Sequence, residues 1–296
     1  MTVFFAGLVK TAIGANWLIL AAIFLRFLLK KAPRRVICLL WAVVAVRLVL
    51  PFSIESPVSL IPQTTVALQE AVDTSLIHVE AVPSGNGAAS HLPTAIATAQ
   101  VPEMHTLPLP TIWAAGMAVM LGYLLISYFR MRYLVREAVQ EEENIWVCDG
   151  VTSPFILGVF RPRIYLPSHI PAQELPYILA HERHHIRRCD HIIKLLAYCA
   201  LCIHWFNPLA WAAFILAGKD MEMSCDEAVI REMGPQIRAD YSASLLRLAT
   251  HKKIIAGMPL AFGEGNTKGR IMNMAKWKKP KLWVSMICIL LCAAVL

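Results

Sequence analysis

The chain has 296 residues, of which 57% are hydrophobic and only 16% are charged. An ordinary soluble domain is about 45–50% apolar, so this chain is too apolar for that class and is expected to need lipid over part of its surface. A formal net charge of +8 is compatible with a nucleic-acid partner, but the basic residues are spread very unevenly.

The charge distribution indicates membrane orientation. No Lys or Arg lies between Arg47 and Arg130, whereas five acidic residues fall in that stretch. Because membrane proteins keep Lys and Arg on the cytoplasmic side, the basic segments are predicted to lie inside the cell. The stretch without Lys or Arg is predicted to lie outside. Direct binding of nucleic acid is therefore not expected.

The amino-terminal part, residues 1–52, is predicted to form two transmembrane helices. The first apolar stretch covers residues 3–29 and is followed by a basic cluster that ends at Arg35, which places the amino terminus outside. A cleaved signal peptide would have its basic residues before the apolar core. The second span covers residues 36–52 and ends beside Pro51.

Residues 53–108 are rich in Pro, Ser, Ala, Thr and Gly, and are predicted to form an irregular extracytoplasmic loop. A third span over residues 109–129 returns the chain to the cytoplasm, where Arg130 follows it. The last apolar run, residues 282–296, gives only about 22 Å of helix. It is expected to be the start of a fourth span, preceded by a lysine cluster in contact with membrane lipid.

Residues 130–281 are predicted to form one cytoplasmic domain. Short strands are expected at residues 146–148 and 163–166, and helices from Pro171 onward. Residues 153–159 are expected to form either an edge strand that pairs with an extended substrate or an ordinary core strand. The fold class is therefore mainly α, an integral membrane protein with three to four transmembrane helices and a cytoplasmic α+β domain.

Residues 181–185 spell H-E-R-H-H, which matches the pattern H-E-x-x-H. Pro176 suits the first turn of a helix, and on that helix His181 and His185 share one face, so both can bind one zinc ion. Glu182 is then the candidate general base. Since a chance match in a chain of this composition is roughly a one-per-cent event, an ordinary exposed helix is the alternative.

The segment 220–227 supplies candidates for a third metal ligand. The apolar run 195–218 is interrupted at Pro208, so we expect a helical hairpin, buried or dipping into the bilayer, that returns this segment to the side of His181. Glu222 and Asp226 are four residues apart and share a helix face. One of them is expected to bind metal while the other orients a ligand histidine.

Four motifs together resemble the BlaR/MecR-type membrane zinc metallopeptidase family of antibiotic-sensor signal transducers. They are HERHHIRRCD at 181–190, HWFNPL at 204–209, DMEMSCDE at 220–227 and SPFILGVFRPRIYLP at 153–167. The similarity covers essentially the whole chain. It implies a zincin-like (gluzincin) domain that binds Zn²⁺ through His181, His185 and Glu222. It also implies that Asp226 orients a ligand histidine and that Asp190 has a structural role.

The resemblance also implies a function. An outside signal would activate the inner protease, which would cleave a cytoplasmic transcriptional repressor of the BlaI/MecI winged-helix type, itself, or both. This chain departs from the best-known members because it contains no S-x-x-K motif and no penicillin-binding sensor domain. We expect any self-cleavage site in the lysine clusters at 252–253 or 276–281.

The sequence leaves two other functions open. The first is a membrane quality-control metalloprotease of the HtpX kind, which the S-C-D-E segment and the four-span layout disfavour. The second is a non-proteolytic receptor or scaffold, which the intact Glu182 disfavours. For the oxyanion-stabilising residue the candidates are Tyr241, Arg238 and His184, each more readily structural than catalytic, and two further histidines, His191 and His204, are expected to have structural partners.

Overall fold

The computed structural model describes residues 2–29, 32–49, 109–251 and 266–277. All of them belong to one compact unit, Met1–Pro51 with Pro108–Leu296. The predicted extracytoplasmic loop, the predicted fourth span and both lysine clusters except Lys276 lie outside the described residues. The helices are α1 (Thr2–Leu28), α2 (Arg34–Val49), α4 (Leu109–Leu134), α5 (Leu175–Arg187), α6 (Asp190–Ile203), α7 (Pro208–Met233), the 3-10 helix η1 (Pro235–Ile237), α8 (Arg238–His251) and α9 (Thr267–Lys276).

Two helices in the described part of the chain are long and apolar enough to cross a membrane, by length and composition. They are Gly7–Leu28 in α1 and Leu109–Leu134. The second, α4, carries exposed apolar side chains along its length, with Val119 71%, Ile126 69% and Phe129 65% exposed. The predicted first and third spans therefore coincide with helices, and α4 continues to Leu134, beyond the predicted end of the span.

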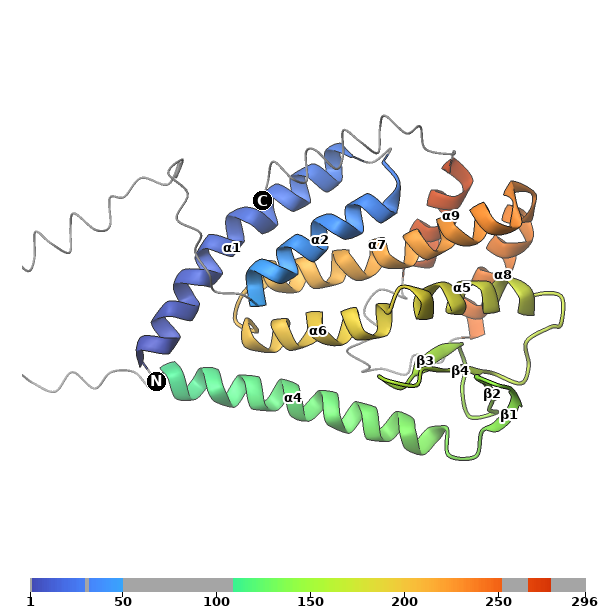
Figure 1. Ribbon diagram of the computed structural model, residues 1–296, viewed down its shortest axis with the longest axis horizontal. Coiled ribbons are helices and arrows are strands. Elements are labelled where there is room, and N and C mark those ends of the chain that lie inside the picture. The colour runs from blue at the N-terminus through green and yellow to red at the C-terminus, as the bar shows by residue number, and fades with distance from the viewer. Residues whose placement is uncertain (1, 30–31, 50–108, 252–265, 278–296) are drawn as a thin grey trace, which may run out of the picture. The chain divides into compact units, whose positions relative to one another are not determined.

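Helix α2 differs from these two helices because it is short and largely covered by protein. Its 16 residues rise only about 24 Å. The buried side chains of α2, from Val36 to Val44, pack in one cluster with Ile19 and Ala22 of α1 and Ala213 of α7. Helices α1, α2 and α7 thus form one packed group (Figure 1).

The apolar run 195–218 folds as the expected helical hairpin. Helices α6 and α7 lie side by side and are joined at Asn207, whose side chain accepts a hydrogen bond from the Leu209 N–H at 3.0 Å (Figure 1). Pro208 occupies the first turn of α7, where its missing N–H is not needed. The chain reverses here because the cap fixes a new helix start and Pro208 cannot continue the old helix.

The hairpin tip reaches the far ends of two neighbouring helices. The His204 Nε2–H donates to the Leu48 carbonyl at 3.0 Å, near the end of α2. The Trp113 indole donates to the Ile203 carbonyl at 2.8 Å, near the start of α4. A Cβ at Gly116 would overlap the Trp205 ring, so the tip packs closely on α4.

A small sheet supports the motif helix. Its strands are β1 (Val139–Glu142), β2 (Ile145–Val147), β3 (Phe155–Leu157) and β4 (Arg163–Leu166), in the order β1-β2-β4-β3. Strands β2 and β4 are parallel with Ile145 opposite Ile164, while β3 runs antiparallel to β4 at one edge. Ile164 and Leu166 pack on Ile178 of α5, which fixes α5 against the sheet.

The expected strands are observed, with β2 shifted one residue towards the amino terminus. The expected strand over residues 153–159 contains the shorter β3, which ends before Gly158. Gly158 has φ of +113°, a conformation that L side chains rarely adopt, and so allows the tight turn from β3 into β4.

Candidate metal centre

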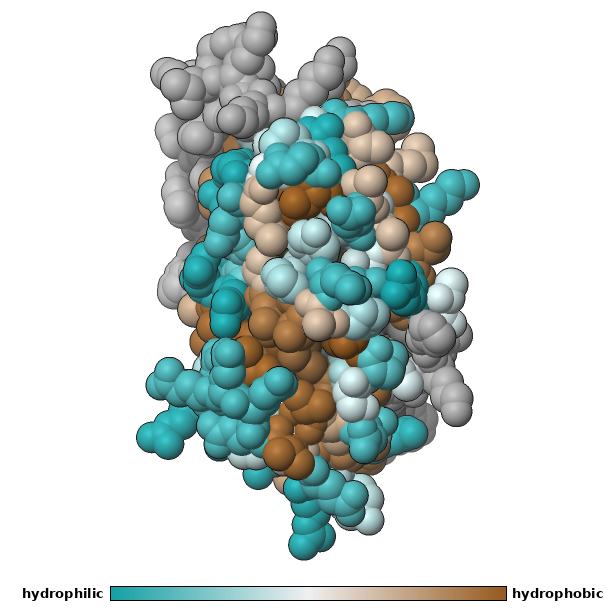
Figure 2. All heavy atoms as spheres, turned by 90° about the vertical axis from the view of Figure 1, so that its right-hand side faces the viewer, coloured by the Kyte–Doolittle hydropathy of each residue, from teal (hydrophilic) through white to brown (hydrophobic). Residues whose placement is uncertain are grey.

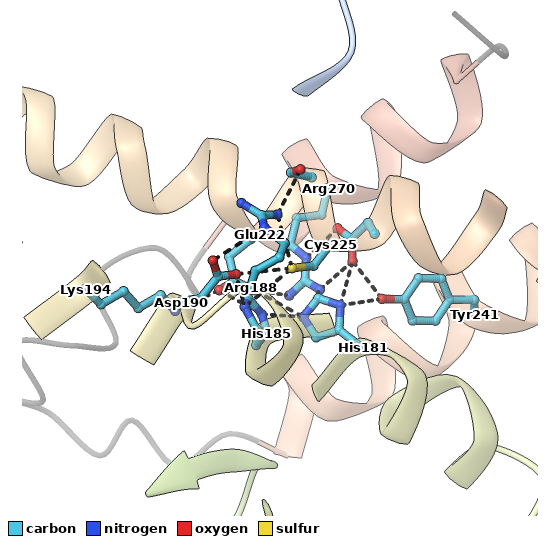
Figure 3. A network of polar contacts seen from close by, with 11 residues as sticks. His181, His185, Arg188, Asp190, Lys194, Glu222, Cys225, Tyr241 and Arg270 are labelled. Atoms are coloured by element: carbon cyan, nitrogen blue, oxygen red, sulfur yellow. Dashed lines mark hydrogen bonds and ion pairs between the residues drawn. The ribbon is translucent and has the colours of Figure 1, made fainter. Parts of the chain in front are cut away.

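Helix α5 presents both histidines of the motif on one buried face. The helix starts at Leu175 with Pro176 in its first turn, and His181, Glu182 and His185 are all buried. The rings of His181 and His185 are 4.7 Å apart at 81°, and their Nε2 atoms are 3.0 Å apart. The two nitrogens therefore point into one small volume (Figure 3).

Glu222 of α7 completes this group, and its carboxylate lies between the two rings. Oε2 is 3.4 Å from His181 Nε2, and Oε1 is 3.6 Å from His185 Nε2. A tetrahedral zinc ion with bonds of about 2.0–2.1 Å separates its ligand atoms by about 3.3 Å. The separations of 3.0, 3.4 and 3.6 Å bracket that value, so these side chains fit a zinc ion. We call His181, His185 and Glu222 the metal-ligand cluster.

His185 is oriented by the residue that begins the next helix. Cys189 adopts φ of +56° between α5 and α6, and this turn brings Asp190 back towards His185. The His185 Nδ1–H donates to Asp190 Oδ2 at 2.7 Å, and the Cys225 sulfur lies 3.4 Å from the same nitrogen. The hydrogen bond leaves the Nε2 lone pair for a metal. Asp190, expected to be structural, thus contacts a ligand histidine directly.

His181 is oriented by Tyr241 and Asp226. Its Nδ1 lies 3.0 Å from the Tyr241 hydroxyl and 3.3 Å from Asp226 Oδ1. Tyr241 donates to Asp226 Oδ1 at 2.7 Å. Burial and the Asp226 charge raise the pKa of Tyr241 well above its ordinary value, so the phenol stays neutral and accepts the His181 Nδ1–H. Tyr241 therefore lies on the side of His181 away from the metal position.

Asp226 also forms a bidentate ion pair with Arg270 of α9. Arg270 Nε donates to Oδ2 at 2.8 Å and Nη2 donates to Oδ1 at 2.7 Å. Burial alone would raise the pKa of Asp226, but the charge of Arg270 and its hydrogen bonds hold it well below its usual range. Asp226 is thus a fixed negative charge behind His181.

Two cations that the sequence analysis did not single out reach the metal-ligand cluster. Lys194 Nζ donates to Glu222 Oε1 at 3.0 Å. Arg270 Nη1 lies 3.5 Å from Glu222 Oε2, and Nη2 lies 3.4 Å from His181 Nε2. Neither residue belongs to a local motif, since Lys194 resembles an ordinary helix residue and Arg270 is 89 positions from His181.

The charges around the cluster favour a protonated His185 when no metal is bound. Burial lowers the pKa of His185, but Cys225, Glu222 and the hydrogen bond to Asp190 raise it well above its ordinary value. Burial would raise the pKa of Glu222, but Lys194 and His185 hold it well below its usual range. A metal ion bound by these residues would therefore displace protons, and its affinity would depend on pH.

His184, Arg238 and His191 have partners outside the metal-ligand cluster. His184 Nε2 is 2.9 Å from Glu232 Oε2, and Arg238 donates to the Trp277 carbonyl at 3.0 Å. His191 donates to the Val159 carbonyl at 3.2 Å, as a structural partner. Glu182 follows His181 on α5 and is buried. Of the three proposed oxyanion donors, only Tyr241 contacts a ligand histidine.

A separate hollow of about 510 Å³ lies between β1, β2 and the start of α5, with Val139, Val147 and Leu175 among its lining residues. Apolar side chains form a band between hydrophilic margins at this end of the unit (Figure 2). None of the residues lining this hollow is a member of the metal-ligand cluster. The chemistry is therefore assigned to the cluster and not to this hollow.

Comparison with known proteins gives a family and several relatives. A family model described as "BlaR1 peptidase M56" matches residues 6–274. "Regulatory protein BlaR1" of Bacillus licheniformis is 30% identical over 135 residues, which cover 43% of this chain and 22% of the relative. "Methicillin resistance mecR1 protein" of Staphylococcus aureus (strain Mu50 / ATCC 700699) is 24% identical over 192 residues, covering 55% and 33%. The chain thus spans between 22% and 33% of the length of these curated relatives.

Proposed function

The chain belongs to the BlaR1 peptidase M56 family, and from this premise we propose that it is an integral membrane zinc endopeptidase in signal transduction. The family is one of membrane-associated metallopeptidases. The observation that carries the proposal is the convergence of His181, His185 and Glu222, whose ligand atoms lie within 4.8 Å of one another. Glu182, which follows His181 on α5 and is buried, would supply the base that a peptidase of this type requires.

The residues of the cluster would divide the chemistry between them. Zinc held by His181, His185 and Glu222 would lower the pKa of a water molecule towards about 7 and polarise the scissile carbonyl. Glu182 would take the proton of the attacking water and pass it to the leaving amine. Asp190 on one side, and Asp226 with Tyr241 on the other, keep the ring nitrogens oriented for this task.

Strand β3 is the proposed binding edge for an extended substrate. It pairs with β4 on one side, and no other described strand pairs with its second side. It also contacts α5, which carries two of the proposed ligands. A peptide that added to β3 would therefore lie beside the helix that holds the metal.

The proposed membrane arrangement has α1, α2 and α4 as spans, with the amino terminus outside and the domain 130–281 in the cytoplasm. The exposed apolar side chains of α4 and the Arg residues at its end support it. Asp220 of α7 pairs with Arg26 and Arg34, at the inner ends of α1 and α2 in this arrangement. The hairpin tip contacts the opposite ends of α2 and α4, which supports a hairpin that dips into the bilayer with the metal site at its base.

The proposed substrate is a cytoplasmic winged-helix repressor of the BlaI/MecI type, the chain itself, or both. The similarity to proteins named for regulation and for methicillin resistance supports a role as a peptidase-type transducer. Family membership favours this role over a quality-control protease of the HtpX kind.

The test uses the full chain, purified in detergent and loaded with zinc. We expect one equivalent of zinc by mass spectrometry and cleavage of a purified BlaI/MecI-type repressor. Glu182→Ala should retain zinc and lose cleavage, whereas the control Glu232→Gln, at a half-exposed carboxylate on α7, should cleave normally. Wild-type protein without stoichiometric zinc, or equal cleavage by wild type and Glu182→Ala, would overturn the assignment.

A further inference from the structure

A peptidase needs a donor for the oxygen that becomes negative during attack on the scissile carbonyl. Tyr241 is engaged at His181 Nδ1 and Asp226, on the side of the ring away from the other ligands. Among the described residues whose contacts with the metal-ligand cluster are given above, two cations remain. They are Lys194 and Arg270, one at each oxygen of Glu222.

Arg270 is held rigidly, and some of its N–H donors are not used by its pair with Asp226. Its side chain is only 9% exposed, and Nε and one N–H of Nη2 are used by the bidentate pair with Asp226. A guanidinium has five N–H donors in a fixed plane, so three remain. Those on Nη2 and Nη1 lie 3.4 Å from His181 Nε2 and 3.5 Å from Glu222 Oε2. Both distances exceed the usual N–H···O range of about 2.7–3.2 Å.

A metal ion at the cluster would remove the contact between Arg270 Nη2 and His181 Nε2. His181 Nε2 has a single lone pair, and once that pair binds a metal it cannot accept a hydrogen bond. The inward N–H of Arg270 Nη2 then loses this acceptor while it remains buried. An unpaired buried donor is unfavourable, so an oxygen atom with developing negative charge beside His181 and Glu222 would be stabilised by it.

We propose that Arg270 is a catalytic residue whose inward N–H groups donate to the scissile carbonyl oxygen as negative charge develops there. The inference rests on the proposed peptidase function. As the water oxygen bonds to the carbonyl carbon, the C=O π pair moves to the oxygen and Glu182 takes the water proton. When the pair returns, the C–N bond breaks and that proton goes to the amine. Arg270 stays protonated and forms no covalent bond.

The second cation fits this role less well. Lys194 Nζ already makes a 3.0 Å contact with Glu222 Oε1, and its side chain is 20% exposed. An ammonium on a flexible four-carbon stem is also less well fixed than a guanidinium held in a fork. Lys194 therefore serves as the alternative in the experiment.

Helix α9 has anchors besides Arg270, so an Arg270 variant keeps other contacts that hold the helix. Asn273, one turn further along the same face, donates to Glu227 Oε1 at 3.1 Å and accepts from Arg34 Nε at 3.2 Å. Arg238 of α8 donates to the Trp277 carbonyl and lies over the Trp277 ring. Arg238→Gln is the matched control, since it removes an arginine that holds α9 without touching the cluster.

The experiment measures two dipeptide inhibitors against zinc-loaded full-length protein in detergent. A phosphonamidate dipeptide presents tetrahedral, anionic oxygens like those of the transition state, whereas a thiol dipeptide binds zinc through sulfur and presents no oxyanion. Arg270→Gln should bind the phosphonamidate about 100-fold more weakly and the thiol within about threefold of wild type. Zinc content should stay at one equivalent, and the Arg238→Gln control should bind both inhibitors like wild type.

Other outcomes contradict the proposal in distinguishable ways. Equal weakening of both inhibitors with loss of zinc would mean that Arg270 only positions Asp226 and His181. No change with Arg270→Gln, or a selective loss with Lys194→Gln instead, would also overturn it. If Arg270→Gln does not fold, Arg270→Lys keeps the charge opposite Asp226 and should lose about tenfold selectively. Wild type that binds neither zinc nor the thiol would overturn the peptidase function and this inference together.

Discussion

Two carboxylates on α7 lie two positions apart and face different surroundings. Asp220 is fully buried and is contacted by Arg26 at 2.6 Å, Arg34 at 3.1 Å and the Trp41 indole at 2.9 Å. Glu222 instead faces the two histidines of α5. Its carboxylate oxygens lie 3.4 Å from His181 Nε2 and 3.6 Å from His185 Nε2. We call Arg26, Arg34, Trp41 and Asp220 the Asp220 cluster.

The difference shows how a carboxylate that stabilises helix packing can lie two positions from one that is proposed to bind a metal ion. The partners of Asp220 are guanidinium groups that keep their charge at all relevant pH values, so its oxygens are permanently occupied. The partners of Glu222 include two imidazoles, whose protons can be exchanged for a metal ion. The Asp220 cluster therefore joins α1, α2 and α7, while the metal-ligand cluster is open to exchange.

The sharpest way to separate the two clusters is to remove Glu222. Glu222→Ala should weaken zinc binding by more than about 100-fold and abolish peptidase activity, because the loss of a ligand exceeds the loss of a group behind it. Zinc competition with a fluorescent chelator measures the affinity. Retention of wild-type affinity would show that another residue completes the site.

Asp220→Asn should have the opposite profile. Its replacement leaves two partly buried arginines without their countercharge, and we expect a loss of about 3 kcal/mol in the free energy of unfolding. Zinc affinity should change by less than about threefold. Thermal unfolding in detergent tests this, with Asp149→Asn as a control at an exposed carboxylate. A zinc defect without a change in stability would contradict the comparison.

Asp190→Asn should give a smaller, purely local effect on the metal. The amide keeps the shape of the carboxylate but removes the negative charge at His185 Nδ1, so we expect zinc to bind about 10–100-fold more weakly. Calorimetric titration with zinc measures it. A variant that bound zinc like wild type would return Asp190 to the structural role expected from the sequence.

The smallest expected effect concerns Glu227 of α7, which accepts a hydrogen bond from the backbone N–H of Arg34. Burial raises its pKa, while Asn273 and the Arg34 backbone N–H only partly offset this. Because the folded pKa lies above the unfolded value of about 4.3, the group's contribution to stability is greatest at low pH and falls as pH rises through the folded pKa.

Glu227→Gln should remove this part of the pH dependence. The variant is expected to gain slightly in stability relative to wild type at pH 7, and this gain should vanish at pH 4. Unfolding midpoints across that range test the sign. A loss of stability at pH 7 would show that the ionised carboxylate is favourable.

Local periodicity was sufficient to identify much of the metal-ligand cluster as candidates. His181 with His185, and Glu222 with Asp226, are pairs at a spacing of four, which places each pair on one helix face. The hairpin was also predictable, because Pro208 and its capping neighbour Asn207 interrupt an apolar run. Hydropathy likewise predicted the helices α1 and α4.

The tertiary structure alone brought Asp190, Lys194 and Arg270 to the cluster. Asp190 returns to His185 through the positive φ of Cys189, which no residue preference announces. Arg270 stands on α9, far along the chain, in a segment that resembles a basic surface helix.

By itself, the sequence determined which side chains share a helix face and which stretches are apolar, because both follow from periods of a few residues. The packing of α7 on α5, and of α9 on α7 and α8, decided which charged residues lie next to each proposed ligand. That docking depends on the packing of side chains distant in the sequence and on the burial of their ion pairs. For this reason the ligands could be proposed from a motif, and Arg270 could be found only in the folded chain.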